Sequence, residues 1–458
     1  MVREMTHGKP LSLILGFCLP MLLGNLFQQL YSMVDTIIVG KFIDVDALAG
    51  VGSTGSVSFL IIGFTMGITS GSCVLPSQCF GAGDHSEMRK YIANAIYLCI
   101  ITTVIVTALA VTMCYPLLKL MQTPADIIDI AYDYIIVVLG GICVTMAYNL
   151  MAGILRAMGD SRTPLYFLIL ASVINIGLDL LFIIVCNMGV AGAGWATVIS
   201  QGISAALCFI YMRRSYPMLR FEKSELKFDG RRVFALAKIG VPVGLQSSIT
   251  AVGSIILQSA VNSLGKVAVA AVTAAGKIQN MVVAPMDTLG ITMATYAGQN
   301  LGAGNVGRIG KGMKCAFASG FIYSAAALLA IWLFGTPLCL MFVEAEETEV
   351  IEKAVYFLWV NACFYPVLSV LFIVRSSLQG LGYSALTMLA GACELISRVV
   401  IAVGFVETMG FDAVCFASPV AWVSAVALLV GVYFIKMKSL GKKTDENGIL
   451  KEGVINHG

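Results

Sequence analysis

One pattern occurs twice in this chain, first as Ser77-Gln78-Cys79-Phe80-Gly81-Ala82-Gly83-Asp84 and again as Gly298-Gln299-Asn300-Leu301-Gly302-Ala303-Gly304-Asn305. The Gln and Gly-Ala-Gly positions match in order, and each copy ends a long apolar segment and precedes basic residues. Self-similarity at a fixed offset is the signature of a repeated structural unit. The offset that aligns the two glutamines therefore predicts that one six-helix unit is present twice.

Two further matches support the duplication. Pro20 and Pro242 stand near the start of the first apolar run of each half. After the fourth run, Arg156-Ala157-Met158-Gly159 matches Gln379-Gly380-Leu381-Gly382. These matches predict equivalent turns at equivalent places in the two halves.

The composition is that of an integral membrane protein. The chain has 458 residues, of which 58% are hydrophobic and 12% charged, whereas soluble domains carry about 25% charged residues. The apolar runs are continuous instead of alternating, so an all-α membrane protein is favoured over a transmembrane barrel. Twelve runs are long enough to span a bilayer, namely residues 12–39, 48–74, 92–114, 127–150, 165–184, 195–212, 239–264, 269–295, 313–333, 350–374, 385–406 and 414–435.

The positions of Lys and Arg predict the orientation, since basic loops stay in the cytoplasm. Most of the 29 basic residues fall on the side that holds both termini. Six runs precede the longest polar interval and six follow it, which predicts two parallel six-helix lobes related by a pseudo-twofold axis along the membrane normal. We expect a monomer in the cell inner (plasma) membrane with both termini cytoplasmic. Its predicted parts are an N-lobe (1–212), a cytoplasmic linker (213–238), a C-lobe (239–435) and a cytoplasmic tail (436–458).

Several function classes lack their sequence signals. The net charge of +3 reflects topology, and no basic stripe with interleaved aromatic residues indicates nucleic-acid binding. Gly50-Val51-Gly52-Ser53-Thr54-Gly55 has the dinucleotide-binding spacing, but no strand precedes it. The sequence contains no P-loop, HExxH or GxSxG motif. We therefore expect no cofactor and no enzymatic activity, and a membrane-embedded enzyme is the alternative from another class.

Asp35 and Asp179 are the first candidates for function, because an ionised group inside a bilayer is costly and usually functional. Each lies a few residues from the outer end of its run, so their depths nearly coincide. Asn175 precedes Asp179 by one helical turn, and Thr197 reaches the same layer. Four oxygen-bearing side chains at one depth predict a site for a hard cation such as Na+, or for a proton on either aspartate. Alternatively, Asn175 and Thr197 only bond neighbouring helices and Asp35 faces the headgroups.

The predicted cation site belongs to the first half alone. The repeat offset places Leu257 and Ala402 where the first half has Asp35 and Asp179. The run that carries Asp35 also contains Pro20, and proline removes a backbone hydrogen bond and bends a helix. This helix is therefore expected to change its bend with cation occupancy, and a static kink is the alternative.

The second half carries a different set of polar residues within its runs. Glu394 and Arg398 are one helical turn apart and are expected to pair, because an unpaired charge in the membrane is expensive. Lys277 and Asp287 lie at middle depths of one run, and Gln246 lies in the run that begins the second half. Lining a polar substrate cavity is the alternative role for this set.

A family resemblance rests on several motifs taken together. They are Val34-Asp35-Thr36-Ile37-Ile38-Val39-Gly40, Asn175-Ile176-Gly177-Leu178-Asp179, Gly194-Trp195-Ala196-Thr197 and the paired Gln-x-x-Gly-Ala stretches. Over almost its full length the chain resembles the multidrug and toxic compound extrusion (MATE) family, in its DinF-like branch.

The resemblance implies two six-helix lobes that form a V-shaped cleft and export driven by an inward Na+ or H+ gradient. It also implies cation binding by Asp35, Asn175, Asp179 and Thr197, with a bend at Pro20 in coupling. The NorM-like branch is expected to carry an acidic residue in the seventh helix. Here the matching stretch, Pro242-Val243-Gly244-Leu245-Gln246, has none, which argues against a cation site in the C-lobe.

The predicted function is that of a secondary-active exporter. It would exchange Na+ or H+ for small amphipathic, cationic organic compounds by alternating access, with membrane lipid as its only other partner. A flippase for lipid-linked precursors, from the same superfamily, is the alternative within transport. The scarcity of Lys and Arg inside the predicted spans argues against this flippase.

Overall fold

The computed structural model describes residues 4–43, 45–120 and 123–442. These residues are almost entirely helical and include no β-strand, so the predicted all-α fold is confirmed. Among the described residues, ten helices are long and apolar enough to cross a membrane, and two bent helix pairs raise the number to as many as twelve. The twelve predicted spans each correspond to one of these helices or pairs.

Most of the helices are longer than the apolar runs that predicted them, because their polar ends extend beyond the apolar segment. The first half contains α1 (Pro10–Phe42), α2 (Val45–Ser53), α3 (Gly55–Ser72), α4 (Val74–Gly81), α5 (His85–Leu120), α6 (Ile128–Gly140), α7 (Ile142–Ala157), α8 (Arg162–Leu180) and α9 (Gly189–Ser215). The second half contains α10 (Gly230–Ser263), α11 (Lys266–Gly302), α12 (Val306–Cys339), α13 (Thr348–Cys363), α14 (Tyr365–Gly380), α15 (Ser384–Gly404), α16 (Val406–Met409) and α17 (Phe411–Gly441).

Two of the predicted spans are bent near their middle. The pair α6–α7 bends by 48° at Gly141, and the pair α13–α14 bends by 53° at Phe364. Pro366 in the first turn of α14 cannot donate a backbone hydrogen bond, which accounts for the second break. At the first break, a Cβ on Gly141 would lie 2.3 Å from Val198 of α9, so only glycine fits there.

The duplicated sequence stretches form the same turn twice. Gly83 and Gly304 both adopt the left-handed conformation, with φ of 76° and 74°. The amide of Asp84 donates to the carbonyl of Cys79, and the amide of Asn305 donates to the carbonyl of Asn300. This is the helix end that a left-handed glycine favours. The predicted equivalence of the two Gly-Ala-Gly stretches is therefore visible in the backbone.

The helices gather into two compact units. Of the described residues, Glu4 and Leu19–Ser248 form the first unit, and Met5–Cys18 together with 249–442 form the second. Both α1 and α10 contribute to both units, because the divisions fall between Cys18 and Leu19 and between Ser248 and Ile249. The lobe boundaries at 212 and 239 stay a prediction.

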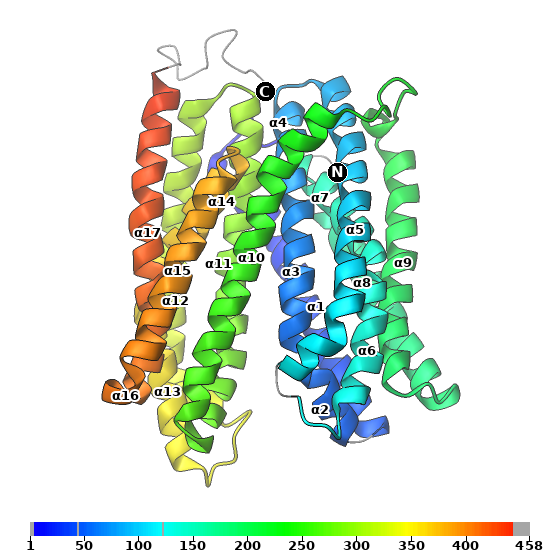
Figure 1. Ribbon diagram of the computed structural model, residues 1–458. Helices are drawn as coiled ribbons and strands as arrows, with labels where there is room; N and C mark the ends of the chain where they lie inside the picture. Colours follow the sequence, from blue (N-terminus) through cyan, green and yellow to red (C-terminus); the bar gives the residue numbers. More distant parts are fainter. Residues whose placement is uncertain (1–3, 44, 121–122, 443–458) are drawn as a thin grey trace. The chain divides into compact units, whose positions relative to one another are not determined.

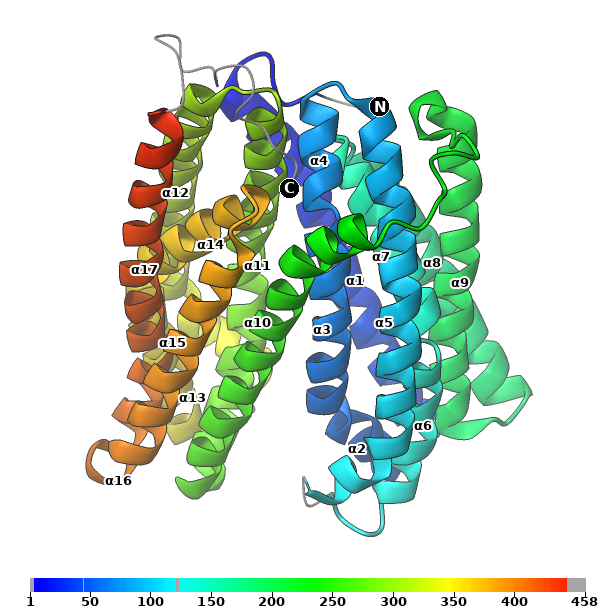
Figure 2. The ribbon, with the colours of Figure 1, turned by 45° about the horizontal axis from the view of Figure 1, so that its top comes forward.

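Within the first unit, α9 lies against α7 and α8 (Figure 1). The amino-terminal part of α10 packs against α3 (Figure 2), where glycines allow backbone contact. A Cβ on Gly67 would lie 2.5 Å from the Cα of Gly244. This close approach is the known role of small residues spaced four apart in membrane helices.

Within the second unit, the helices α15 and α17 lie side by side, as do α11 and α14 (Figures 1 and 2). A Cβ on Gly380 of α14 would lie 2.1 Å from the carbonyl oxygen of Ala294 in α11. The second unit therefore also depends on glycine at a helix contact.

The connection between α9 and α10 is shorter than the predicted linker 213–238, because the ends of that linker belong to α9 and α10. Residues 216–229 connect these helices and dock on the amino end of α5. Arg89 contacts both carboxylate oxygens of the buried Glu225 at 2.7 Å and donates to the carbonyl of Met218. Hydrogen bonds from Arg89 lower the pKa of Glu225 to about 2. The linker is thus fixed to the first unit by a charge-assisted contact.

A comparable contact holds the segment before α1 in the second unit. Gln299 accepts a hydrogen bond of 2.8 Å from the amide of Met5, and Arg308 donates to the carbonyls of Met5 and Gly8. Gln299 belongs to the duplicated Gln-x-x-Gly-Ala stretch. In each half, therefore, the region around this stretch anchors the segment that leads into the first helix of the other half.

Candidate cation-binding site

The four side chains predicted to bind a cation meet in the first unit. Asn175 donates a hydrogen bond of 3.5 Å from its amide nitrogen to the hydroxyl of Thr197, which joins α8 to α9. The carboxyl groups of Asp35 in α1 and Asp179 in α8 are close enough to interact directly. Asp179 is fully buried and Asn175 is 2% exposed, whereas Asp35 and Thr197 are half-buried. The two aspartates therefore face one shared pocket of side chains, and Asp35 does not lie on an exposed rim.

Several oxygen atoms in this cluster have no hydrogen-bond donor among the described residues. They are Oδ1 of Asp35, both carboxylate oxygens of Asp179 and Oδ1 of Asn175, and all four are buried. A buried acceptor without a partner is rare and costly in a folded protein. The cluster is thus rich in acceptors and poor in donors, which is the condition a bound cation or proton would relieve.

Several polar side chains that were not predicted to belong to the site lie around the two aspartates. Tyr31 lies one turn before Asp35 in α1, and its hydroxyl interacts with Gln201 of α9 and with the aspartates. The side-chain oxygen of Gln201 accepts a hydrogen bond of 2.8 Å from Thr145 of α7. Tyr134 of α6 also interacts with Asp35. These groups extend the polar layer over five helices.

Helical spacing could have identified two of these residues. Tyr31 precedes Asp35 by four positions, and Gln201 follows Thr197 by four. The same i,i+4 relation links Asn175 to Asp179 and was enough to predict that these two side chains share a helix face. Thr145 and Tyr134 carry no such signal, because only the packing of α6 and α7 brings them to the layer.

The backbone changes its helical form immediately after Asp179. Residues Leu181–Val185 form a π-helical turn at the end of α8, and Asn187 then has a positive φ of 50°. Single π turns within membrane helices occur frequently at functional sites. The turn widens the helix directly beside the carboxylate and gives the end of α8 an irregular geometry.

The ligand chemistry of the cluster consists of oxygen atoms only. Two carboxylates, one amide oxygen and hydroxyl groups are the donors that hard cations prefer. Within the ranges that the structure describes, no three His, Cys, Asp or Glu side chains form a metal-binding group. The set fits Na+, or a proton held on one of the two aspartates.

Pro20 lies in the interior of α1, and the helix continues through it. The division between the two units of the molecule falls just before it, between Cys18 and Leu19. The same helix carries Tyr31 and Asp35 into the polar layer. A change in its bend would therefore reach the carboxylate.

In the second unit, Glu394 pairs mainly with a residue that lies directly after the predicted span 350–374. Arg375 lies inside α14, is buried, and donates a hydrogen bond to Glu394 of α15. Arg398 reaches the other carboxylate oxygen at 4.0 Å, so the predicted pair exists but is the weaker one. Asp287 of α11 interacts electrostatically with Arg375. These four residues form a charge-balanced group with two cations and two anions.

The remaining predicted residues of the second half lie elsewhere. Gln246 is buried in the part of α10 that belongs to the first unit. Lys277 lies apart from the charge-balanced group, with its ammonium nitrogen 5.5 Å from the ring centre of Phe342. Within the second unit, the predicted polar set therefore divides into the charge-balanced group and Lys277.

Comparisons with known proteins agree with the duplicated fold. The MatE family model matches the chain twice, over residues 20–181 and 242–403. The probable multidrug resistance protein YpnP of Bacillus subtilis is 29% identical over 386 residues, which cover 83% of this chain and 84% of that protein. The probable multidrug resistance protein NorM of Thermotoga maritima is 24% identical over 347 residues, which cover 74% of this chain and 73% of that protein. The structure of a MOP superfamily transporter from Pyrococcus furiosus superposes with a TM-score of 0.89 at 22% identity, covering 96% of this chain and 98% of that one.

Proposed function

The chain belongs to the MatE family of multi-pass membrane transporters, and we propose that it is an exporter that exchanges Na+ or H+ for amphipathic, cationic organic compounds. Family membership makes it a multidrug resistance transporter and not an enzyme. Its place in the DinF-like branch stays a prediction. Beyond family membership, we propose three things: the coupling ion, the class of substrate and the direction of exchange.

One observation carries the coupling proposal. Asp35 and Asp179 lie together in a cluster whose buried oxygens lack donors among the residues described. Two ionised carboxylates at short distance repel each other, so a cation or proton between them is strongly favoured. The proposed ion therefore binds at Asp35, Asn175, Asp179 and Thr197, with Tyr31 and Gln201 fixing the position of α1 against α9.

Exchange requires only that the ion and the substrate favour different conformations of the protein. In the proposed cycle, the substrate binds from the cytoplasm or the inner leaflet, and an ion from outside then occupies the aspartate pair. Ion binding pulls Asp35 toward Asp179 and so alters α1 beyond Pro20. The conformation that results has a low affinity for the substrate, which leaves on the outside.

The proposal includes a location and an assembly state. We propose a location in the plasma membrane, and the distribution of Lys and Arg supports cytoplasmic termini. We propose that the monomer is sufficient, because each part of the ion cluster comes from one chain. The coupling ion is the only inorganic partner in the scheme, and no nucleic acid takes part.

Efflux of rhodamine 123 from proteoliposomes tests the coupling. One set of vesicles has a Na+ gradient at fixed pH, and another has a pH gradient without Na+. Wild type is expected to respond to one of the two gradients, and Asp35→Asn and Asp179→Asn are expected to lose that response. Asp133→Asn is the matched control, because this exposed aspartate of α6 lies outside the cluster. Unchanged gradient-driven efflux in both cluster variants would refute the assignment.

A further inference from the structure

One face of α11 carries a polar stripe that the ion cluster does not use. Lys266, Ala270, Thr273 and Lys277 recur at helical spacing, so they lie along one side of the helix. All four are exposed on the surface of the second unit. At 1.5 Å per residue, Lys277 lies about 16 Å along α11 from Lys266. This distance is roughly half the apolar thickness of a bilayer, about 30 Å, so the stripe brings an ammonium group deep into the membrane-spanning part of α11.

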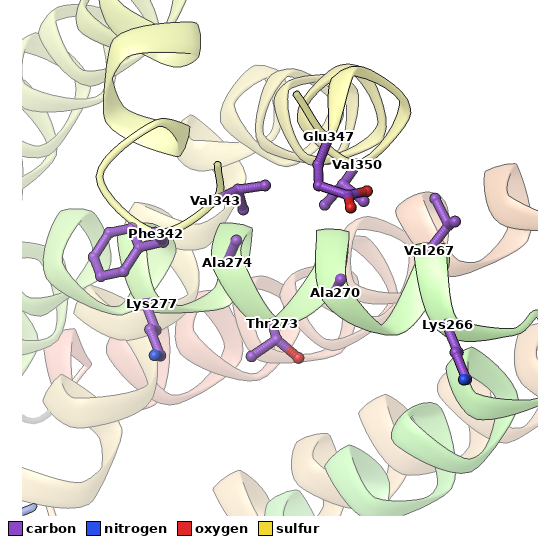
Figure 3. A pocket seen from close by; sticks show the side chains of 10 residues that line it. All are labelled: Lys266, Val267, Ala270, Thr273, Ala274, Lys277, Phe342, Val343, Glu347 and Val350. Atoms are coloured by element: carbon purple, nitrogen blue, oxygen red, sulfur yellow. The ribbon is translucent and has the colours of Figure 1, made fainter. Parts of the chain in front are cut away.

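The stripe borders a pocket of about 510 Å³ within the second unit. Figure 3 shows Lys266, Thr273 and Lys277 projecting from the same side of α11, while Val343, Glu347 and Val350 approach from the segment that begins α13. Phe342 and Ala274 complete the apolar part of the wall (Figure 3). The volume lies within the range of small-molecule sites, roughly 300 to 1,000 Å³.

Lys277 has no carboxylate partner in the part of the chain that the structure describes. Its ammonium nitrogen lies 5.5 Å from the ring centre of Phe342, and a cation–π contact offsets only a small part of the cost of a charge in a membrane. Lysine in a membrane helix normally pairs with an anion or faces a polar cavity. This ammonium group therefore lacks the counter-ion that its position requires.

The charge balance of the pocket also favours an anion. Two ammonium groups, Lys266 and Lys277, line it against a single carboxylate, Glu347. Glu347 stands at the N-cap of α13, where the positive end of the helix compensates its charge. Lys266 is the first residue of α11, so the positive end of that helix adds to the lysines. The pocket is net positive although the whole chain is nearly neutral.

We propose that this pocket binds an anionic group, a carboxylate or a phosphate, carried by an amphipathic molecule. Lys277 pairs with the anionic group, Lys266 attracts it at the end of α11, and Ala274, Val343 and Val350 contact the apolar part. This inference rests on the proposed export function in one respect: it adds zwitterionic amphiphiles to the cationic substrates proposed for the exporter. Binding itself requires neither an ion gradient nor the aspartate pair.

Two dyes that differ at a single group provide the test. Rhodamine 110 carries a free carboxylate, and rhodamine 123 is its methyl ester. Binding of each dye to the purified full chain in phosphatidylcholine nanodiscs is measured by fluorescence anisotropy, without any gradient. Lys277→Gln is expected to weaken rhodamine 110 binding about tenfold, as for the loss of one charge-assisted contact. Rhodamine 123 binding is expected to change less than about twofold, because the ester offers no charge to the ammonium group.

Three further variants separate the charge from the fold. Lys277→Arg is expected to keep rhodamine 110 binding, and Lys266→Gln to weaken it by a smaller factor. Lys353→Gln is the control, since this lysine of the same unit pairs with Glu349 outside the pocket. Equal loss of both dyes in Lys277→Gln, unchanged binding of rhodamine 110, or no rhodamine 110 binding to wild type would each overturn the inference.

A lipid and a soluble solute could supply the same anionic group. Nanodiscs that contain phosphatidylglycerol distinguish these sources. If this lipid weakens rhodamine 110 binding to wild type but not to Lys277→Gln, a lipid headgroup phosphate occupies the pocket; if it has no effect, the pocket takes its anion from solution. Failure of gradient-driven rhodamine 123 efflux would count against the proposed export function and would leave this binding result unaffected.

Discussion

Asn175 donates a hydrogen bond of 3.5 Å to the hydroxyl of Thr197, and this contact joins α8 to α9 beside the paired aspartates. It uses the amide nitrogen of Asn175 and leaves the buried amide oxygen without a donor among the described residues. The hydrogen bond therefore sets the orientation of the amide and leaves its oxygen as an unused acceptor. Thr197 fixes that orientation in addition to offering its own oxygen.

The Thr197 hydroxyl is expected to matter for ion affinity. Thr197→Val keeps the shape of the side chain and removes the partner of Asn175, so the half-saturating concentration of the coupling ion should rise about tenfold, in line with the loss of one buried hydrogen bond. Thr197→Ser keeps the hydroxyl and should stay within about threefold of wild type. The measurement is the initial rate of rhodamine 123 efflux against ion concentration. Equal behaviour of the two variants would show that the hydroxyl has no part in ion binding.

The docking of the linker is expected to depend on the charge of Glu225. Hydrogen bonds from Arg89 lower the pKa of this carboxyl from its ordinary value of 4.5 to about 2 in the folded protein. A lowered pKa means that the charge stabilises the fold fully above about pH 4.5 and progressively less as the pH falls toward 2. Glu225→Gln should therefore speed amide hydrogen exchange in residues 220–229 about tenfold at pH 7.

The pH dependence supplies the control for this experiment. The difference between wild type and Glu225→Gln, corrected for intrinsic exchange, should be constant from pH 5 to 8 and shrink below pH 4.5. Glu222→Gln serves as the matched variant, since Glu222 contacts Glu225 through its backbone amide and carbonyl, which the substitution keeps. A difference that disappears between pH 6 and 8 would contradict the assignment to this carboxylate.

The contact between α3 and α10 is expected to tolerate no side chain at Gly67. A Cβ there would lie 2.5 Å from the Cα of Gly244, whereas a Cβ on Gly63, one turn earlier, would meet Ser247 at an ordinary 3.6 Å. Gly67→Ala should lower stability by about 1–3 kcal/mol through overpacking, and Gly63→Ala should be neutral or slightly stabilising. Thermal unfolding of the purified variants in detergent is the measurement. Equal midpoints for the two variants would rule out close packing at Gly67.

The charge-balanced group of the second unit is expected to be a structural requirement. Glu394 contacts both Arg375 and Arg398, so Glu394→Gln leaves two buried guanidinium groups without their common anion. Breaking a buried pair from one side costs about 3–5 kcal/mol, which should appear as poor expression and a lowered unfolding midpoint. Glu407→Gln, an exposed glutamate of α16, should have no effect. A stable Glu394→Gln variant that loses only transport would instead assign the group to the substrate path.

Helical spacing predicted which residues of the ion cluster share a face of the same helix, but not their partners on other helices. Asn175 and Asp179 share a face because four residues make one turn, and no knowledge of neighbours was needed. The pairing of Glu394 with Arg398 followed from the same rule but missed the stronger partner. Arg375 belongs to another helix, and as a charged residue it ended the predicted apolar run at residue 374.

The amino-acid sequence alone determined that this chain is a duplicated bundle of membrane helices. Uninterrupted apolar runs of this length are unfavourable in water, and matched turn motifs can be recognised without any knowledge of tertiary contacts. Only the tertiary structure decided which polar groups share a pocket. Tyr31 and Gln201 join the aspartates, Arg375 joins Glu394, and Lys277 lies beside Phe342 with no carboxylate partner in the described part of the chain. The reason is physical: the helix repeat fixes the face on which a side chain lies, whereas its partners depend on how neighbouring helices pack.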